Sequence, residues 1–84
     1  MPRGRFVVCE VKSATPENVR QQARLGLGQV LDYREGLRRA VRLEVLAVLV
    51  LTLPPPSVVV EAALSVGVRV ASADDLERAL APLT

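Results

Sequence analysis

Two kinds of hydrophobic pattern alternate along this chain, and together they predict strands separated by helices. The short apolar runs that are typical of strands lie at 5–12, 45–53 and 68–71. The segments with helical character run from 16 to between 33 and 41, from 57 to about 65, and from 72 or 74 to about 80. The order β-α-β-α-β-α predicts an α/β fold with a small, mostly parallel sheet and right-handed crossovers.

Turn residues place the ends of these elements. Thr15 is a good N-cap, and Pro16 fits the first position of the long helix. The three prolines at 54–56 end the second strand, and Ser57 can cap the helix after them. Pro82 stops the last helix.

The first strand is apolar on both of its alternating faces. Phe6 and Val8 lie on one face, and Val7, Cys9 and Val11 lie on the other. This pattern predicts a covering layer on each side of the strand. We expect Cys9 to be a small core residue. Because it is the single cysteine, no disulfide can form within the chain, which is typical of a cytoplasmic protein.

The length of 84 residues allows one domain at most, spanning 1–84, with a modest core. Phe6 and Tyr33 are the only aromatic residues, so the core must consist of Val, Leu and Ala. The longest uncharged apolar run, 45–53, is far shorter than the roughly 20 residues that a membrane span needs. We therefore expect no membrane partner.

The formal net charge of +2 conceals an asymmetry between the two halves of the chain. Residues 1–42 carry nine basic and four acidic side chains, a net charge of +5, whereas residues 43–84 carry two basic and five acidic ones, a net charge of −3. A basic half suggests a side that faces a polyanion. The alternative is a solvated helix face.

Polar residues follow two flanks of the long helix, on either side of its apolar stripe. Arg20 and Arg24 project along one flank, and Gln29 and Tyr33 project along the other. A polar helix flank with a half-buried tyrosine is the simpler interpretation of the second group.

Two glycines, Gly26 and Gly28, lie inside this helix. Each costs roughly 1 kcal/mol relative to alanine in a helix interior. A close approach of another backbone or of a ligand is one reason to tolerate that cost. Gly28 points away from the apolar face, so we expect no such approach there.

A carboxylate and an ammonium end the first strand. Glu10 and Lys12 are two residues apart, so they share a face, while Val11 points to the other and leaves its carbonyl between them. A carboxylate suits Mg²⁺, and a lysine can stabilise the charge that develops at a phosphate. These are components for metal-assisted phosphodiester hydrolysis. The alternative interpretation of this triplet is a solvated ion pair.

The segments FVVCEVKS, LGLGQVLDYREGLRR, EVLAVLVLTLPPP and GVRVAS together resemble the PD-(D/E)XK nuclease superfamily, which has the restriction-endonuclease-like fold. The resemblance covers about residues 5–71 and concerns the later half of the family's core. The Glu-x-Lys motif of the family matches Glu10 and Lys12. The Gln-x-x-x-Tyr motif of several branches matches Gln29 and Tyr33, on the helix that follows.

The resemblance implies a role for each matching residue. Glu10 and the carbonyl of Val11 would hold Mg²⁺ or Mn²⁺, and Lys12 would be the catalytic cation near the scissile phosphate. Gln29 and Tyr33 would assist the active site or bind DNA.

The arginines on the other flank are poorer candidates for the active site. Arg20 and Arg24 would contact the backbone of the nucleic acid, and the alternative is that they only meet solvent.

The sequence departs from the family pattern at its beginning, where the usual first helix and hairpin are also missing. The family's first acidic residue precedes the glutamate in an earlier strand, and residues 1–5 contain no acid. Three explanations stay open: a missing N-terminal segment, a homo-oligomer or other chain that supplies an acid, and a degenerate domain that binds without cutting. The chain is thus expected to be a nuclease or its catalytic C-terminal half, or else a non-catalytic nucleic-acid-binding or dimerising α/β module.

Overall fold

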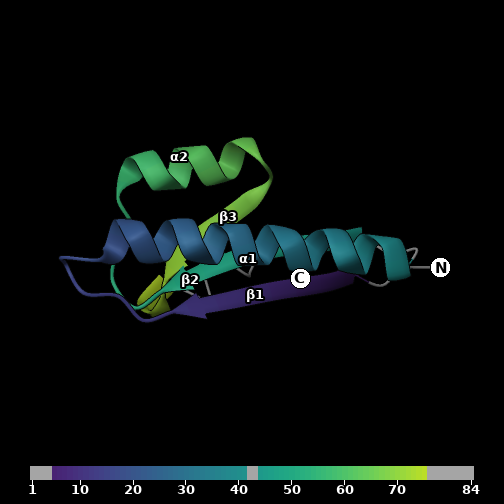
Figure 1. Cartoon of the computed structure of the whole chain (residues 1–84), viewed down its shortest axis with the longest axis horizontal. Helices are drawn as coiled ribbons and strands as arrows, with labels where there is room; N and C mark the ends of the chain where they lie inside the picture. Colours follow the sequence, from purple (N-terminus) through teal and green to yellow (C-terminus); the bar gives the residue numbers. More distant parts are fainter. Residues whose placement is uncertain (1–4, 42–43, 76–84) are drawn as a thin grey trace.

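The computed structural model describes residues 5–41 and 44–75 of the chain (Figure 1). The elements, in order, are β1 (Arg5–Lys12), α1 (Val19–Ala40), β2 (Glu44–Leu51), α2 (Ser57–Ser65), β3 (Val68–Ser72) and the 3₁₀ turn η1 (Ala73–Asp75). The predicted α/β class is confirmed, and so is the order of the first five elements. Ser72 and Asp74, the two expected starts of the last helix, lie in β3 and in η1, and the rest of that helix with its stop at Pro82 lies outside the described residues.

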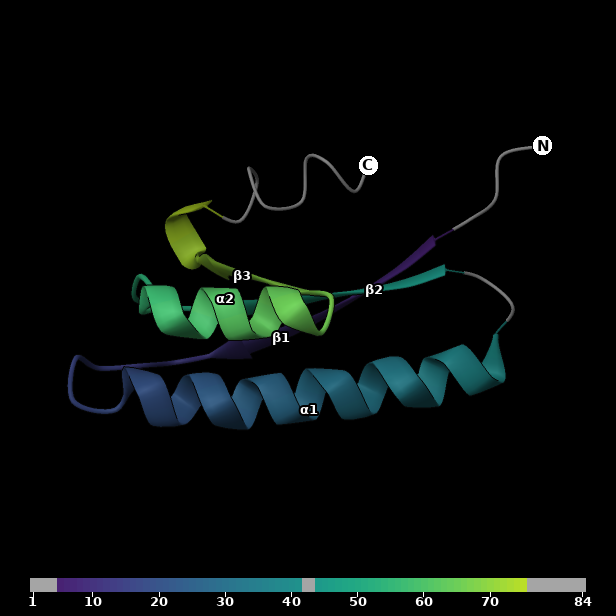
Figure 2. The ribbon, with the colours of Figure 1, turned by 90° about the horizontal axis from the view of Figure 1, so that it is seen from above.

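The three strands form one parallel sheet in the order β1-β2-β3. Lys12 lies beside Leu51, and Val68 lies beside Ala47 on the other side of β2. Each helix carries the chain back along the sheet before the next strand is added (Figures 1 and 2). Successive right-handed crossovers in one direction place both helices on the same face of the sheet.

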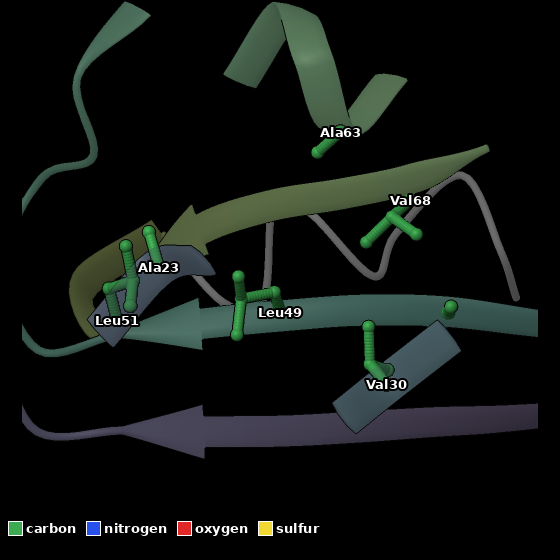
Figure 3. Packing of buried hydrophobic residues seen from close by; sticks show 7 residues of the cluster. Ala23, Val30, Leu49, Leu51, Ala63 and Val68 are labelled. Atoms are coloured by element: carbon green, nitrogen blue, oxygen red, sulfur yellow. The ribbon is translucent and has the colours of Figure 1, made fainter. Parts of the chain in front are cut away.

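The hydrophobic cluster shown in Figure 3 lies between this face and the two helices. Val48 and Val50 of β2 are buried as well, on the opposite face of the sheet. The buried cluster takes residues from every strand and helix except β1, namely Ala23, Val30, Ala47, Leu49, Leu51, Ala63 and Val68. Val8 of β1 packs against the cluster but is only partly buried. The aliphatic composition of the core follows the expectation from a sequence with two aromatic residues.

β1 is less buried than its sequence predicts. It is the edge strand, and Phe6, Val7, Cys9 and Val11 are all exposed, Val11 to 62%. The expectation of Cys9 as a core residue is therefore wrong. An edge strand loses the shielding that a second neighbouring strand gives, and the described helices cover one face alone.

α1 begins three residues later than predicted. Thr15 does not cap it; instead the backbone N–H of Thr15 donates to Oδ1 of Asn18 at 2.7 Å, and the N–H of Asn18 donates to the carbonyl of Thr15 at 3.1 Å. This local turn uses residues 16–18, so the helix starts at Val19. Similarly, Pro56 rather than Ser57 holds the N-cap position of α2, without a side-chain cap.

An arginine joins the two helices. The guanidinium of Arg34 donates from Nη2 to the carbonyl of Val66 at 2.9 Å and from Nη1 to the carbonyl of Gly67 at 3.2 Å. Gly67 has a φ of +75°, which favours glycine after a helix. Burial lowers the pKa of Arg34, repulsion by Arg38 lowers it further, and Glu35 opposes both. The contact fixes the C-terminal end of α2 against α1.

Candidate functional site at the end of the first strand

Glu10 and Lys12 form an ion pair on the helix-covered face of β1. Lys12 Nζ lies 3.3 Å from Glu10 Oε1, and the two side chains are 19% and 17% exposed. Their shared face follows from the two-residue period of a strand, as the sequence predicts. Their shielding does not follow from that period, because it depends on how α1 lies over the sheet edge.

Gly26 is the point at which α1 comes closest to this pair. A Cβ at this position would overlap Leu49 Cδ1 of β2 and would lie 3.0 Å from Lys12 Cγ of β1. α1 therefore lies above the groove between β1 and β2. Gly28 has no atom within 4 Å of such a Cβ, which confirms that it points away.

Gln29 stands one helical turn beyond Gly26 on the flank above β1. Because α1 runs back along β1, a rise of about 4.5 Å brings Gln29 from the level of Lys12 toward that of Glu10. Its Oε1 is buried and has no hydrogen-bond partner among the described residues. A buried acceptor without a donor is costly, so this atom marks an unsatisfied polar position beside the pair.

Tyr33 lies a further turn along α1 and is 51% exposed. It shares an open depression of about 680 Å³ with Val8 and Gly36. Neither Glu10 nor Lys12 lines this depression. The structure thus brings Gln29 close to the level of the ion pair and places Tyr33 farther toward the start of β1.

Backbone contacts fix the loop that follows Lys12. Thr52 Oγ1 accepts the N–H of Ala14 at 2.8 Å and donates to the carbonyl of Ala14 at 3.3 Å. Gln22 Nε2 donates to the carbonyl of Ser13 at 2.9 Å. Neither Thr52 nor Gln22 is among the site residues predicted from the sequence. A threonine directly after an apolar strand is the signal that points to the first of them.

The carbonyl of Val11 faces a different direction from the carboxylate of Glu10. The N–H of Thr52 donates to the carbonyl of Lys12 at 3.2 Å, so Lys12 directs its backbone toward β2. Successive residues of a strand alternate, and Val11 therefore directs its carbonyl toward the free edge of the sheet. An ion that contacts both oxygens would have to sit at this edge.

The described residues alone do not supply a complete metal site. They contain no group of three or more His, Cys, Asp or Glu side chains that could hold an ion together. Mg²⁺ prefers octahedral oxygen coordination, commonly through carboxylates and water, and the carboxylate of Glu10 is already paired with Lys12. A functional ion site at this place needs a second acid from outside residues 5–41 and 44–75.

The two arginines lie on the far side of α1, as their spacing predicts. Arg20 and Arg24 line a small groove of about 140 Å³ between α1 and α2, together with apolar residues such as Val58 and Val59. Both arginines are exposed. The helix separates this groove from the Glu10–Lys12 pair.

A scan of protein families, a search of curated proteins and a search of solved structures gave no match to this chain. Neither described helix combines the length with the apolar composition that crossing a bilayer requires.

Proposed function

We propose that this chain carries the Glu-x-Lys portion of a metal-dependent nuclease that acts on DNA. The observation that carries the proposal is the shielded ion pair of Glu10 and Lys12 at the end of an edge strand. Charged side chains that lie largely out of water need a partner or a function. Here each has a partner, and the free edge beside them leaves room for a further strand.

Each residue has a proposed role that uses its own chemistry. The ammonium of Lys12 stabilises the negative charge that develops on a phosphate, and Glu10 supplies one carboxylate to Mg²⁺ or Mn²⁺. Such an ion, when bound, lowers the pKa of a water and polarises the phosphate. Gln29 Oε1 has no hydrogen-bond donor among the described residues. In the proposed site it accepts a hydrogen bond from Lys12 or from a bound water. The backbone carbonyl of Val11, which points to the free edge of the sheet, is a second oxygen ligand for the ion.

The remaining candidate residues bind the nucleic acid. Arg20 and Arg24 contact phosphates of DNA from the groove between the helices, and Tyr33 contacts DNA at the edge of the site. We place this activity in the cytoplasm. The second acid comes from a segment or chain outside the described residues, because those residues contain no group of three or more His, Cys, Asp or Glu side chains that could hold an ion.

A second candidate is a non-catalytic DNA-binding module. This candidate is favoured by the zero net charge of the ion pair, since the ammonium of Lys12 already balances the carboxylate of Glu10. In this case the groove lined by Arg20 and Arg24 binds the DNA. Binding then weakens as salt rises, and Arg20→Ala with Arg24→Ala reduces both the affinity and the slope of log affinity against log salt.

The test is cleavage of supercoiled DNA in Mg²⁺ or Mn²⁺ by the full chain and its variants. We expect Glu10→Gln and Lys12→Met to reduce cleavage by about 100-fold or more. Glu35→Gln and Arg39→Met are matched controls, because these residues form an exposed ion pair at 3.5 Å on α1. Cleavage that persists in Glu10→Gln rejects the nuclease. Salt-sensitive binding without cleavage supports the second candidate.

A further inference from the structure

The outer edge of β1 presents a regular row of backbone donors and acceptors. β1 is the terminal strand of the described sheet. Because Lys12 directs its backbone to β2, the alternate residues Val7, Cys9 and Val11 direct their N–H and C=O groups outward. No described segment pairs with them. Such an edge is a template for another strand.

The same residues expose apolar side chains. Val7 is 40% exposed, Val11 is 62% exposed, and Cys9 between them is exposed as well. Edge strands that remain unpaired are usually protected by an outward lysine, a proline or a bulge. Arg5 and Lys12 mark the ends of this strand, and its centre from Phe6 to Cys9 has no such protection.

We propose that β1 pairs with β1 of a second copy of this chain, antiparallel and with Cys9 opposite Cys9. In this register Val7 of one copy lies opposite Val11 of the other, so apolar residues meet on the face of β1 that α1 does not cover. The outward N–H and C=O groups of these residues form the hydrogen-bonded pairs of an antiparallel ladder. Two three-stranded sheets thereby become one continuous sheet.

The position of α1 fits this pairing. α1 lies above the groove between β1 and β2, since Gly26 approaches both Leu49 and Lys12. With strands about 4.8 Å apart, the two α1 helices would lie about 10 Å from each other, a normal packing distance. Leu25, which is 51% exposed, lies next to the flank of α1 that would be covered.

The charges of the strand also fit. The register places Lys12 opposite Phe6 and Glu10 opposite Val8, so no like charges stand directly across from each other. The two Glu10 side chains become diagonal neighbours, about 7–8 Å apart at Cα. Each is balanced by its own Lys12 at 3.3 Å. This inference does not rest on the nuclease proposal, because it is argued from the unpaired edge of β1 alone.

Crosslinking of Cys9 tests the register directly. Cα atoms of a hydrogen-bonded antiparallel pair are about 5.5 Å apart, within disulfide range. Diamide, which accepts the two electrons of the paired thiols, should produce a covalent dimer of the full chain. The matched control is Glu35→Cys in a Cys9→Ser background, an exposed site on α1. We expect crosslinking at Cys9 at least 10-fold faster; equal rates would overturn the register.

Sedimentation equilibrium tests the pairing without any chemistry. Val11→Lys places a charge opposite the apolar Val7 of the other copy, and we expect it to weaken dimerisation by at least 10-fold. Val58→Lys is the control, because Val58 is 52% exposed on α2, away from the edge. A wild-type chain that is monomeric at millimolar concentration, or equal effects of the two variants, would refute the proposal. Neither readout depends on DNA cleavage.

Discussion

Lys12 Nζ lies 3.3 Å from Glu10 Oε1, and less than one-fifth of either side chain is exposed. The two residues are neighbours on one strand, so the strand itself sets their distance, and α1 above them limits the access of water. Ion pairs of this kind differ from exposed ones, because removing one partner leaves a charge with little solvent to replace it. The same pair is the centre of the proposed function.

A double-mutant cycle should measure this difference. Lys12→Met leaves Glu10 without a counter-charge, and we expect a loss of about 1–2 kcal/mol of unfolding free energy. Glu10→Gln in the same chain should recover part of that loss. The exposed pair of Glu35 and Arg39 should give a coupling of about 0.3–0.5 kcal/mol or less. Urea unfolding supplies all the values, and equal couplings would show that shielding by α1 has no effect.

The two helical glycines should respond in opposite directions to alanine. Gly26→Ala places a methyl group against Leu49 Cδ1, so we expect a net loss of about 1–3 kcal/mol even after the gain in helix propensity. Gly28→Ala meets no atom within 4 Å and should stabilise the chain by about 0.5–1 kcal/mol. Thermal unfolding of both variants checks the prediction. A stabilising Gly26→Ala would mean that the helix lies farther from the sheet.

Thr52→Val should loosen the loop after β1. The hydroxyl of Thr52 accepts the N–H of Ala14 at 2.8 Å, and valine keeps the shape without the acceptor. We expect a loss of about 1 kcal/mol and at least 5-fold faster hydrogen exchange at the Ala14 amide. The amide of Thr15, which donates to Asn18, serves as the internal reference. Unchanged exchange at Ala14 would contradict the role of Thr52.

Arg34→Met should weaken the contact between α1 and α2. It removes the donors to Val66 and Gly67 and keeps most of the aliphatic length, so we expect a loss of about 1 kcal/mol. Arg38→Met, an exposed change one turn away, should have a much smaller effect. Denaturant unfolding compares the two variants, and the prediction is wrong if both lose the same free energy.

Most of the fold was predictable because it depends on local patterns. The run at 5–12 matches β1, and Ser57–Ser65 matches the second predicted helix. The start of α1 was not predictable from capping preferences, since Asn18 uses its side chain on Thr15 rather than on the helix. The exposure of β1 does not follow from its apolar sequence either, because edge position depends on strand order and not on the composition of one strand.

The site could be predicted only in part. The period of a strand places Glu10 and Lys12 on one face, and the structure has them there. The period of a helix separates Gln29 from Arg24, which line different flanks. The shielding of the pair and the unsatisfied Oε1 of Gln29 depend on the distance between α1 and β1, and that distance is a property of packing.

Gly26 sets this distance by having a hydrogen atom where other residues have a side chain. A helix displaced outward by one methyl group would admit water around the ammonium and the carboxylate, and the attraction between two charges falls as the local dielectric constant rises. The electrostatic strength of the charged pair is therefore controlled from a different element, by a residue that carries no charge and makes no hydrogen bond through a side chain.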